Sequence, residues 1–97
     1  MKSRQAMMIE DKLPSVEAYF QSQRVKLFGD GVWRSAYCHF HYDKKLERMM
    51  RINMKKGQFF CFQCGVEGKD FIQYHEKRYG LSFVKAVKRL GAWKADK

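Results

Sequence analysis

The chain has 97 residues, a formal net charge of +10 at neutral pH and three cysteines. A chain of this length forms one domain with a small core, which often needs a disulfide or metal staple. The first 14 residues are charged at several positions and lack the apolar stretch of a secretory signal, and no run is long enough to span a membrane. We therefore expect a cytoplasmic protein, whose cysteines more often bind metal than form disulfides.

Residues 1–12 show no periodic pattern, and we expect them to form a flexible N-terminal arm. A helix is predicted to start at Ser15 and to continue through residues 16–21, because Pro14 ends the arm and a serine can cap the first turn. Residues 24–28 then alternate in the manner of a strand. Gly29-Asp30-Gly31 is a turn signal, and residues 32–37 are predicted to return as the partner strand.

A second hairpin is predicted over residues 50–62. Met50, Ile52 and Met54 share one face of its first strand, and Arg51, Asn53 and Lys55 share the other. The turn is expected at residues 56–57, and the returning strand at residues 58–62.

Two short helices are predicted to close the chain. The first covers residues 70–78, with Asp70 as its cap and Gly80 just past its end, and the second opens at Ser82 and stops at Gly91. The second helix repeats apolar residues at a spacing that predicts a core face, which consists of Phe83, Ala86, Val87 and Leu90. Its cations Lys85, Lys88 and Arg89 lie off that face, and a solvated surface is favoured over a binding surface.

Two pairs of potential metal ligands occur, each with two residues between its members and 19 residues between the pairs. They are Cys38 with His41 and Cys61 with Cys64. Such spacing lets a tight turn aim both donors at one ion, and three thiolates with one imidazole form a closed tetrahedral set. The sequence therefore predicts one structural Zn²⁺, whose role is to hold the fold together.

The other two histidines are not expected to bind the ion. His39 adjoins Cys38 and would need a strained chelate, so we expect it to be an exposed residue of the turn. His75 falls in a predicted helix and is read as a surface or packing residue. Catalytic zinc is also disfavoured, because no position is left open for water.

Several segments together form a pattern. They are Val25-Lys26-Leu27, Gly31-x-Trp33, Cys38-x-Phe40-His41, Phe60-Cys61-Phe62-x-Cys64-Gly65-x-x-Gly68, Tyr74 and the helix over residues 83–90. This pattern resembles the N-terminal zinc-binding domain of bacterial and phage DNA primases, and the resemblance extends over residues 15–91. The family usually has proline at the position of His39 and a Pro-Ser pair near residues 46–48, so the metal turn and the template preference are expected to differ.

The resemblance implies an α+β fold over residues 13–97. In it, a small zinc ribbon of antiparallel hairpins is flanked by an N-terminal helix and two short C-terminal helices. It places the zinc ligands at Cys38, His41, Cys61 and Cys64. It further implies that the domain binds single-stranded template DNA and cooperates with a separate RNA polymerase domain.

Proteins bind single strands by combining cations that contact phosphates with aromatic rings that stack on bases. The net charge agrees with an anionic partner, although solubility alone also explains it. The candidate nucleic-acid residues are Lys26, Trp33, Arg34, Lys44, Lys45, Arg48, Arg51, Lys55 and Phe59. Trp33 serves equally well as a core residue, and at least two of Phe59, Phe60 and Phe62 are expected to be buried.

The leading hypothesis is a single-stranded DNA-binding module that acts in trans in the DNA replication of a bacterium, phage or mobile element. Since no polymerase segment or acidic metal cluster precedes Lys97, we expect no catalytic activity from these residues, whether they are a full gene product or an excised domain. The alternative is a zinc-stapled adaptor that docks on a primase, helicase or polymerase. Its surface would include Tyr74, Tyr79 and Trp93.

Overall fold

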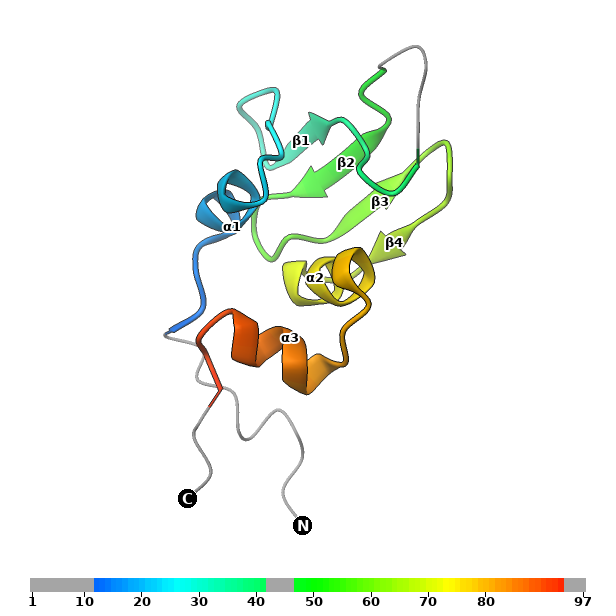
Figure 1. The fold of residues 1–97 in the computed structure, drawn as a ribbon. Coiled ribbons are helices and arrows are strands. Elements are labelled where there is room, and N and C mark those ends of the chain that lie inside the picture. The colour runs from blue at the N-terminus through cyan, green and yellow to red at the C-terminus, as the bar shows by residue number, and fades with distance from the viewer. Residues whose placement is uncertain (1–11, 42–46, 94–97) are drawn as a thin grey trace, which may run out of the picture.

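The structure is a computed structural model that describes residues 12–41 and 47–93. One antiparallel sheet has the strand order β1-β2-β3-β4 (Figure 1). The elements in chain order are α1 (Val16–Ser22), β1 (Trp33–Ala36), β2 (Met50–Asn53), β3 (Phe59–Cys61), β4 (Glu67–Gly68), α2 (Phe71–Tyr79) and α3 (Phe83–Arg89). This arrangement confirms the predicted small α+β zinc ribbon.

The strand register sorts the side chains of the sheet into an inner and an outer face. Ser35 pairs with Arg51, Arg51 with Phe60, and Phe60 with Glu67, so these side chains share the outer face. Their neighbours Met50 and Ile52 point inward, and both are fully buried. The predicted alternation of residues 50–53 is therefore confirmed.

The prediction of the first hairpin is wrong for its first strand, residues 24–28. Residues 24–28 make only an isolated bridge, between Phe28 and Ser35, and β1 pairs with β2 instead. The chain turns tightly as it leaves α1, because Arg24 has a φ of 60° and the Val25 amide donates to the Phe20 carbonyl at 2.9 Å. The two-residue strand β4 was not predicted, since a Glu-Gly pair carries no strand signal of its own.

The predicted helix boundaries agree with the structure to within a residue or two. Ser15, Asp70 and Ser82 accept hydrogen bonds from amides three residues onward, at 3.1, 2.9 and 3.2 Å. Gly80 ends α2 with a φ of 65°, a left-handed conformation that glycine adopts without strain. Local capping chemistry thus sets where each helix begins and where α2 ends.

The core lies between the inner face of the sheet and the three helices. Figure 1 shows the helices below and beside the sheet, with α2 next to β4 and α3 on the far side of α2. Tyr74 of α2 is fully buried, and its ring centre lies 5.0 Å from that of Phe20 and 5.1 Å from that of Phe59. The predicted core face of α3 is confirmed at Ala86 and Val87, which are fully buried.

In the described ranges, no helix combines the length and apolar character that crossing a membrane requires. The predicted arm over residues 1–12 lies outside these ranges except for Lys12, and so do Lys44 and Lys45. The boundary between an arm and a domain that starts at residue 13 therefore stays a prediction.

Candidate metal centre and sheet surface

Two tight turns carry the predicted ligands. Cys38 follows β1, and its Sγ accepts a hydrogen bond from the Phe40 amide at 3.3 Å. Cys61 is the last residue of β3, and its Sγ accepts from the Gln63 amide at 3.4 Å. Each turn thus folds its backbone around the first sulfur and directs the second ligand of the pair toward the same point.

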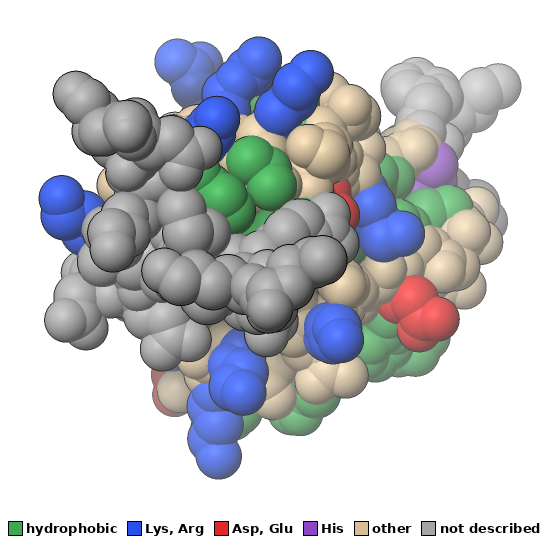
Figure 2. All heavy atoms as spheres, turned by 90° about the horizontal axis from the view of Figure 1, so that it is seen from below, with side chains coloured by type: hydrophobic (Ala, Val, Ile, Leu, Met, Phe, Trp, Pro, Cys, Tyr) green, Lys and Arg blue, Asp and Glu red, His purple; other side chains and the backbone are tan. Residues whose placement is uncertain are grey.

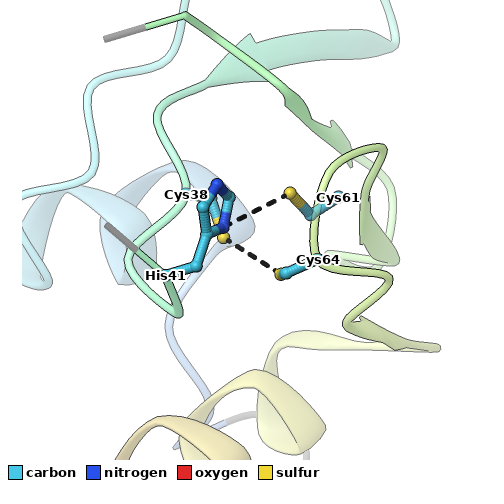
Figure 3. Close-up of side chains that lie close together, drawn as sticks. All are labelled: Cys38, His41, Cys61 and Cys64. Carbon is cyan, nitrogen blue, oxygen red and sulfur yellow. Dashed lines mark hydrogen bonds between the residues drawn. The ribbon is translucent and has the colours of Figure 1, made fainter. Parts of the chain in front are cut away.

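The four side chains converge from these turns (Figure 3). Their ligand atoms all lie within 4.8 Å of one another. The Sγ atoms of Cys38 and Cys64 are 3.8 Å apart, and Cys61 Sγ is 3.8 Å from His41 Nδ1. In a tetrahedral site with Zn–S bonds of about 2.3 Å, two sulfurs are separated by about 3.8 Å. The observed spacing therefore fits one zinc ion bound by the whole group.

The chemistry of the donors also fits a metal ion. Burial raises the pKa of the Cys38 thiol to about 12. Burial acts in the same direction on Cys61, but hydrogen bonds from the amides of Cys64 and Gln63 and from the Cys38 and Cys64 thiols together outweigh it and hold the pKa of that thiol below its usual value. The His41 Nε2 atom is buried and has no hydrogen-bond partner among the described residues. A divalent cation stabilises neighbouring thiolates and fixes the imidazole, and a donor set of three thiolates and one imidazole is typical of structural zinc.

The remaining histidines lie outside the metal group. His75 is a packing residue, as expected, since it is 7% exposed and its Nδ1 lies 2.8 Å from the Tyr19 hydroxyl. His39 is half-buried, so the prediction of an exposed residue is wrong. Burial and then the charge of Arg78 lower the pKa of His39.

The outer face of the sheet carries a chain of aromatic contacts. The ring centres of Trp33 and Phe60 lie 5.8 Å apart, and those of Phe60 and Phe62 lie 5.0 Å apart. Trp33 is 45% exposed and Phe62 is 60% exposed. The guanidinium carbon of Arg51 lies 5.3 Å from the centre of the Phe62 ring. A cation thus sits among accessible aromatic rings on this face.

A second aromatic group lies at the β1 edge of the same face. Phe28 pairs with the outward-facing Ser35, and its ring centre is 5.8 Å from that of Tyr37. Lys26 and Arg48 place their charged ends 5.3 and 4.3 Å from the centre of the Phe28 ring. The Arg48 carbonyl accepts a 3.1 Å hydrogen bond from Arg51 Nη1, which links the two groups. Together they form the aromatic face, which consists of Phe28, Trp33, Tyr37, Phe60 and Phe62 with the cations Lys26, Arg48 and Arg51.

Most of the described candidate nucleic-acid residues lie on this face or near it. Trp33, Lys26, Arg48 and Arg51 belong to the face, and Lys55 is exposed in the turn between β2 and β3. Arg34 pairs with the buried Ile52, so its side chain leaves β1 on the opposite side of the sheet from the aromatic face. Its Nε donates to the Gly31 carbonyl at 2.9 Å.

The prediction that Phe59 contacts nucleic acid is wrong, because its side chain is 1% exposed and cannot reach a base. Its strand partner is the buried Ile52, so it points inward, whereas Phe60 points outward. Cys61 points inward like Phe59. Because side chains alternate along a strand, an inward-facing Cys61 is by itself enough to predict that its neighbours Phe60 and Phe62 point outward. The surface predicted for the adaptor is also wrong at one position, because Tyr74 is fully buried.

The helical end of the molecule is rich in cations. Figure 2, which views the molecule from below, shows Lys and Arg side chains at several places around this end and fewer acidic ones. Lys85, Lys88 and Arg89 of α3 are exposed. Whether they form only a solvated surface stays a prediction.

Comparison with known proteins places this geometry in a family. The sequence model of the CHC2 zinc finger matches residues 8–95. The chain is also similar to the crystal structure of the Aquifex aeolicus primase that contains the zinc-binding and RNA polymerase domains. The TM-score is 0.66 and the identity 26%, over 99% of this chain and 23% of that one. No curated protein matches the sequence significantly.

The family match covers most of the chain, and the matched structure contains a zinc-binding domain with the same fold. The four converging ligand residues agree with the zinc that gives such domains their name. The chain therefore belongs to the CHC2 zinc finger family and is a zinc-binding domain of the primase type.

Proposed function

We propose that this zinc domain binds single-stranded DNA on the aromatic face. The observation that supports the proposal is the contact chain of Trp33, Phe60 and Phe62 with the Arg51 guanidinium beside it. Unpaired bases expose their flat surfaces to aromatic rings, while the phosphates need cations close by. Duplex DNA keeps its bases stacked, so this face is suited to a single strand.

The zinc ion contributes by holding the face in shape. Cys61 ends β3 and lies between Phe60 and Phe62 in the sequence, so a fixed Cys61 also fixes the direction of both rings. The domain would then serve DNA replication by presenting a template strand in trans to a separate primase polymerase. This partner is inferred from the primase family and from the polymerase domain of the Aquifex structure.

The first experiment is fluorescence anisotropy of the zinc-loaded chain with labelled single-stranded and duplex oligonucleotides over a salt series. We expect single strands to bind more tightly, with an affinity that falls several-fold for each doubling of salt as counterions are released. Equal binding of both forms, or none at moderate salt, would contradict the proposal. It would then favour the adaptor that docks on a primase, helicase or polymerase.

Matched substitutions locate the binding surface. Trp33→Ala removes a stacking ring and should weaken single-strand binding roughly tenfold, whereas the exposed neighbour Val32→Ala should change it by no more than about twofold. Arg51→Gln and Lys88→Gln each remove one positive charge, on the aromatic face and on α3 respectively. A larger loss for Lys88→Gln than for Arg51→Gln would move the site to the helical end.

A further inference from the structure

A cleft opens where the aromatic face meets α2. It has a volume of about 510 Å³ and lies along the edge of β3 and β4. Phe60 belongs both to its wall and to the contact chain of the aromatic face. Gln58, Glu67 and Lys69 line it from the sheet side, and Gln73, Glu76 and Lys77 line it from α2. The cleft thus continues the face beyond its last aromatic ring on this side.

Two carboxylates line this cleft, Glu67 of β4 and Glu76 of α2, and Glu67 is the one that pairs with Phe60 of the aromatic face. It is exposed and pairs with Phe60 across the β3–β4 ladder, so its side chain leaves β4 on the same outer face as the Phe60 ring. A negative charge repels phosphates, and on a surface that otherwise carries Lys26, Arg48 and Arg51 it weakens the attraction for any nucleic acid. Its position therefore suits a group that contacts a base.

The chemistry of a carboxylate selects among the bases. An ionised carboxylate only accepts hydrogen bonds, and its two oxygens match two neighbouring donors. Guanine carries two adjacent donors, N1–H and the N2 amino group, on the edge that an unpaired base exposes. Cytosine and adenine offer one amino group beside an acceptor, and thymine offers one N–H between two acceptors.

We propose that the cleft binds one guanine nucleotide of the single strand, with the base against Phe60 and its N1–H and N2 amino groups on Glu67. Lys69 and Lys77 would contact the flanking phosphates. This inference rests on the proposed single-strand binding and adds a base preference to it. The volume of the cleft is sufficient for one nucleotide and falls in the range of small-molecule sites.

The backbone around Glu67 holds this wall in place. A Cβ atom at Gly68 would lie 2.4 Å from the buried Phe59 ring, so the strand packs directly on that ring. The Lys69 amide donates to Gln73 Oε1 at 2.9 Å, which ties the end of β4 to α2. Glu67 therefore projects from a fixed strand, and Lys69 projects from the residue directly after it.

The test uses the zinc-loaded full chain and thymidine oligonucleotides that contain one central guanosine, one central inosine or neither. Inosine keeps N1–H and lacks the N2 amino group. We expect the guanosine strand to bind about tenfold more tightly than the inosine strand, because one charge-assisted hydrogen bond is lost. In Glu67→Gln this difference should disappear, while plain thymidine strands bind as well as before or better.

Glu17→Gln is the control, since Glu17 is exposed on α1 and loses the same charge. It should keep the full difference between guanosine and inosine. If Trp33→Ala weakens all strands but wild-type protein does not distinguish guanosine from inosine, this inference is overturned and the proposed function stands. If no strand binds, both are overturned.

Discussion

At the scale of single residues, the hydrogen bond between Tyr19 and His75 joins α1 to α2. Both side chains are buried, and 2.8 Å separates the hydroxyl from Nδ1. Burial raises the pKa of Tyr19 far above its usual value, so the hydroxyl stays protonated where it pairs with Nδ1 of the ring. The bond thus satisfies two polar groups that would otherwise be buried unpaired.

Tyr19→Phe should lower the free energy of unfolding by about 1–3 kcal/mol, because His75 Nδ1 stays buried without its hydrogen-bond partner. Urea unfolding of the zinc-loaded protein measures the change. Tyr79→Phe is the matched control, since Tyr79 is 46% exposed and its hydroxyl bond to Gln23 lies at the surface. Equal effects of the two substitutions would show that the buried hydrogen bond contributes no more to the free energy of unfolding than the exposed one.

The same histidine gives the fold a dependence on pH. Burial, and then the charge of Arg89, lower the pKa of His75 below its usual 6.5. The unfolded chain therefore takes up a proton at His75 before the folded chain does, so stability is complete above about pH 7 and declines as pH falls below 6.5.

We expect His75→Gln to reduce the slope of stability against pH between pH 7 and 5.5. Unfolding midpoints at several pH values measure it, with zinc content followed in parallel, because the metal ligands also take up protons in acid. An unchanged slope in the variant would show that His75 is not the source of this pH dependence.

At the scale of elements, the close contact between β4 and β3 depends on a glycine. A Cβ atom at Gly68 would approach the Phe59 ring to 2.4 Å, and that ring is 1% exposed and packs on Tyr74. The space that a Gly68 side chain would need is therefore occupied by the core of the domain and not by solvent.

Gly68→Ala should destabilise the protein by about 1–3 kcal/mol, because a buried ring must move in a packed core. Gly31→Ala is the control, since a Cβ atom there meets nothing within 4 Å. Thermal unfolding of both variants measures the effect. A neutral Gly68→Ala would mean that β4 can shift away from the sheet without cost.

At the scale of the whole molecule, one metal centre joins parts of the chain that are distant in sequence. The group links the turn after β1 to the turn between β3 and β4, and both turns adjoin the core. Structural zinc contributes roughly 10–16 kcal/mol in small finger peptides, which equals or exceeds the stability of a small domain.

Chelation of the ion should therefore unfold at least residues 32–68, and Cys61→Ser should abolish zinc binding and folding together. Circular dichroism and amide exchange, before and after addition of a chelator, measure the loss and its reversal by zinc. A folded, zinc-free Cys61→Ser protein would show that the core holds without its metal staple.

The sequence by itself determined the features that depend on local chemistry. The ligand spacing predicted the zinc group, Ser15, Asp70 and Ser82 predicted the helix starts, and the alternation after Met50 predicted the buried face of β2. Each of these signals lies within a few residues of the structure that it predicts, so no distant contact was needed to interpret it.

Tertiary structure alone decided what depends on partners far along the chain. Strand pairing placed Phe59 inside and Phe60 outside, which reversed the predicted role of Phe59. The packing of Tyr74 against α1 and β3 removed it from the surface, and pairing of β1 with β2 left residues 24–28 outside the regular sheet. The physical reason is that a side chain's direction follows from the strand or helix it packs against, and that partner was fixed only when the whole core assembled.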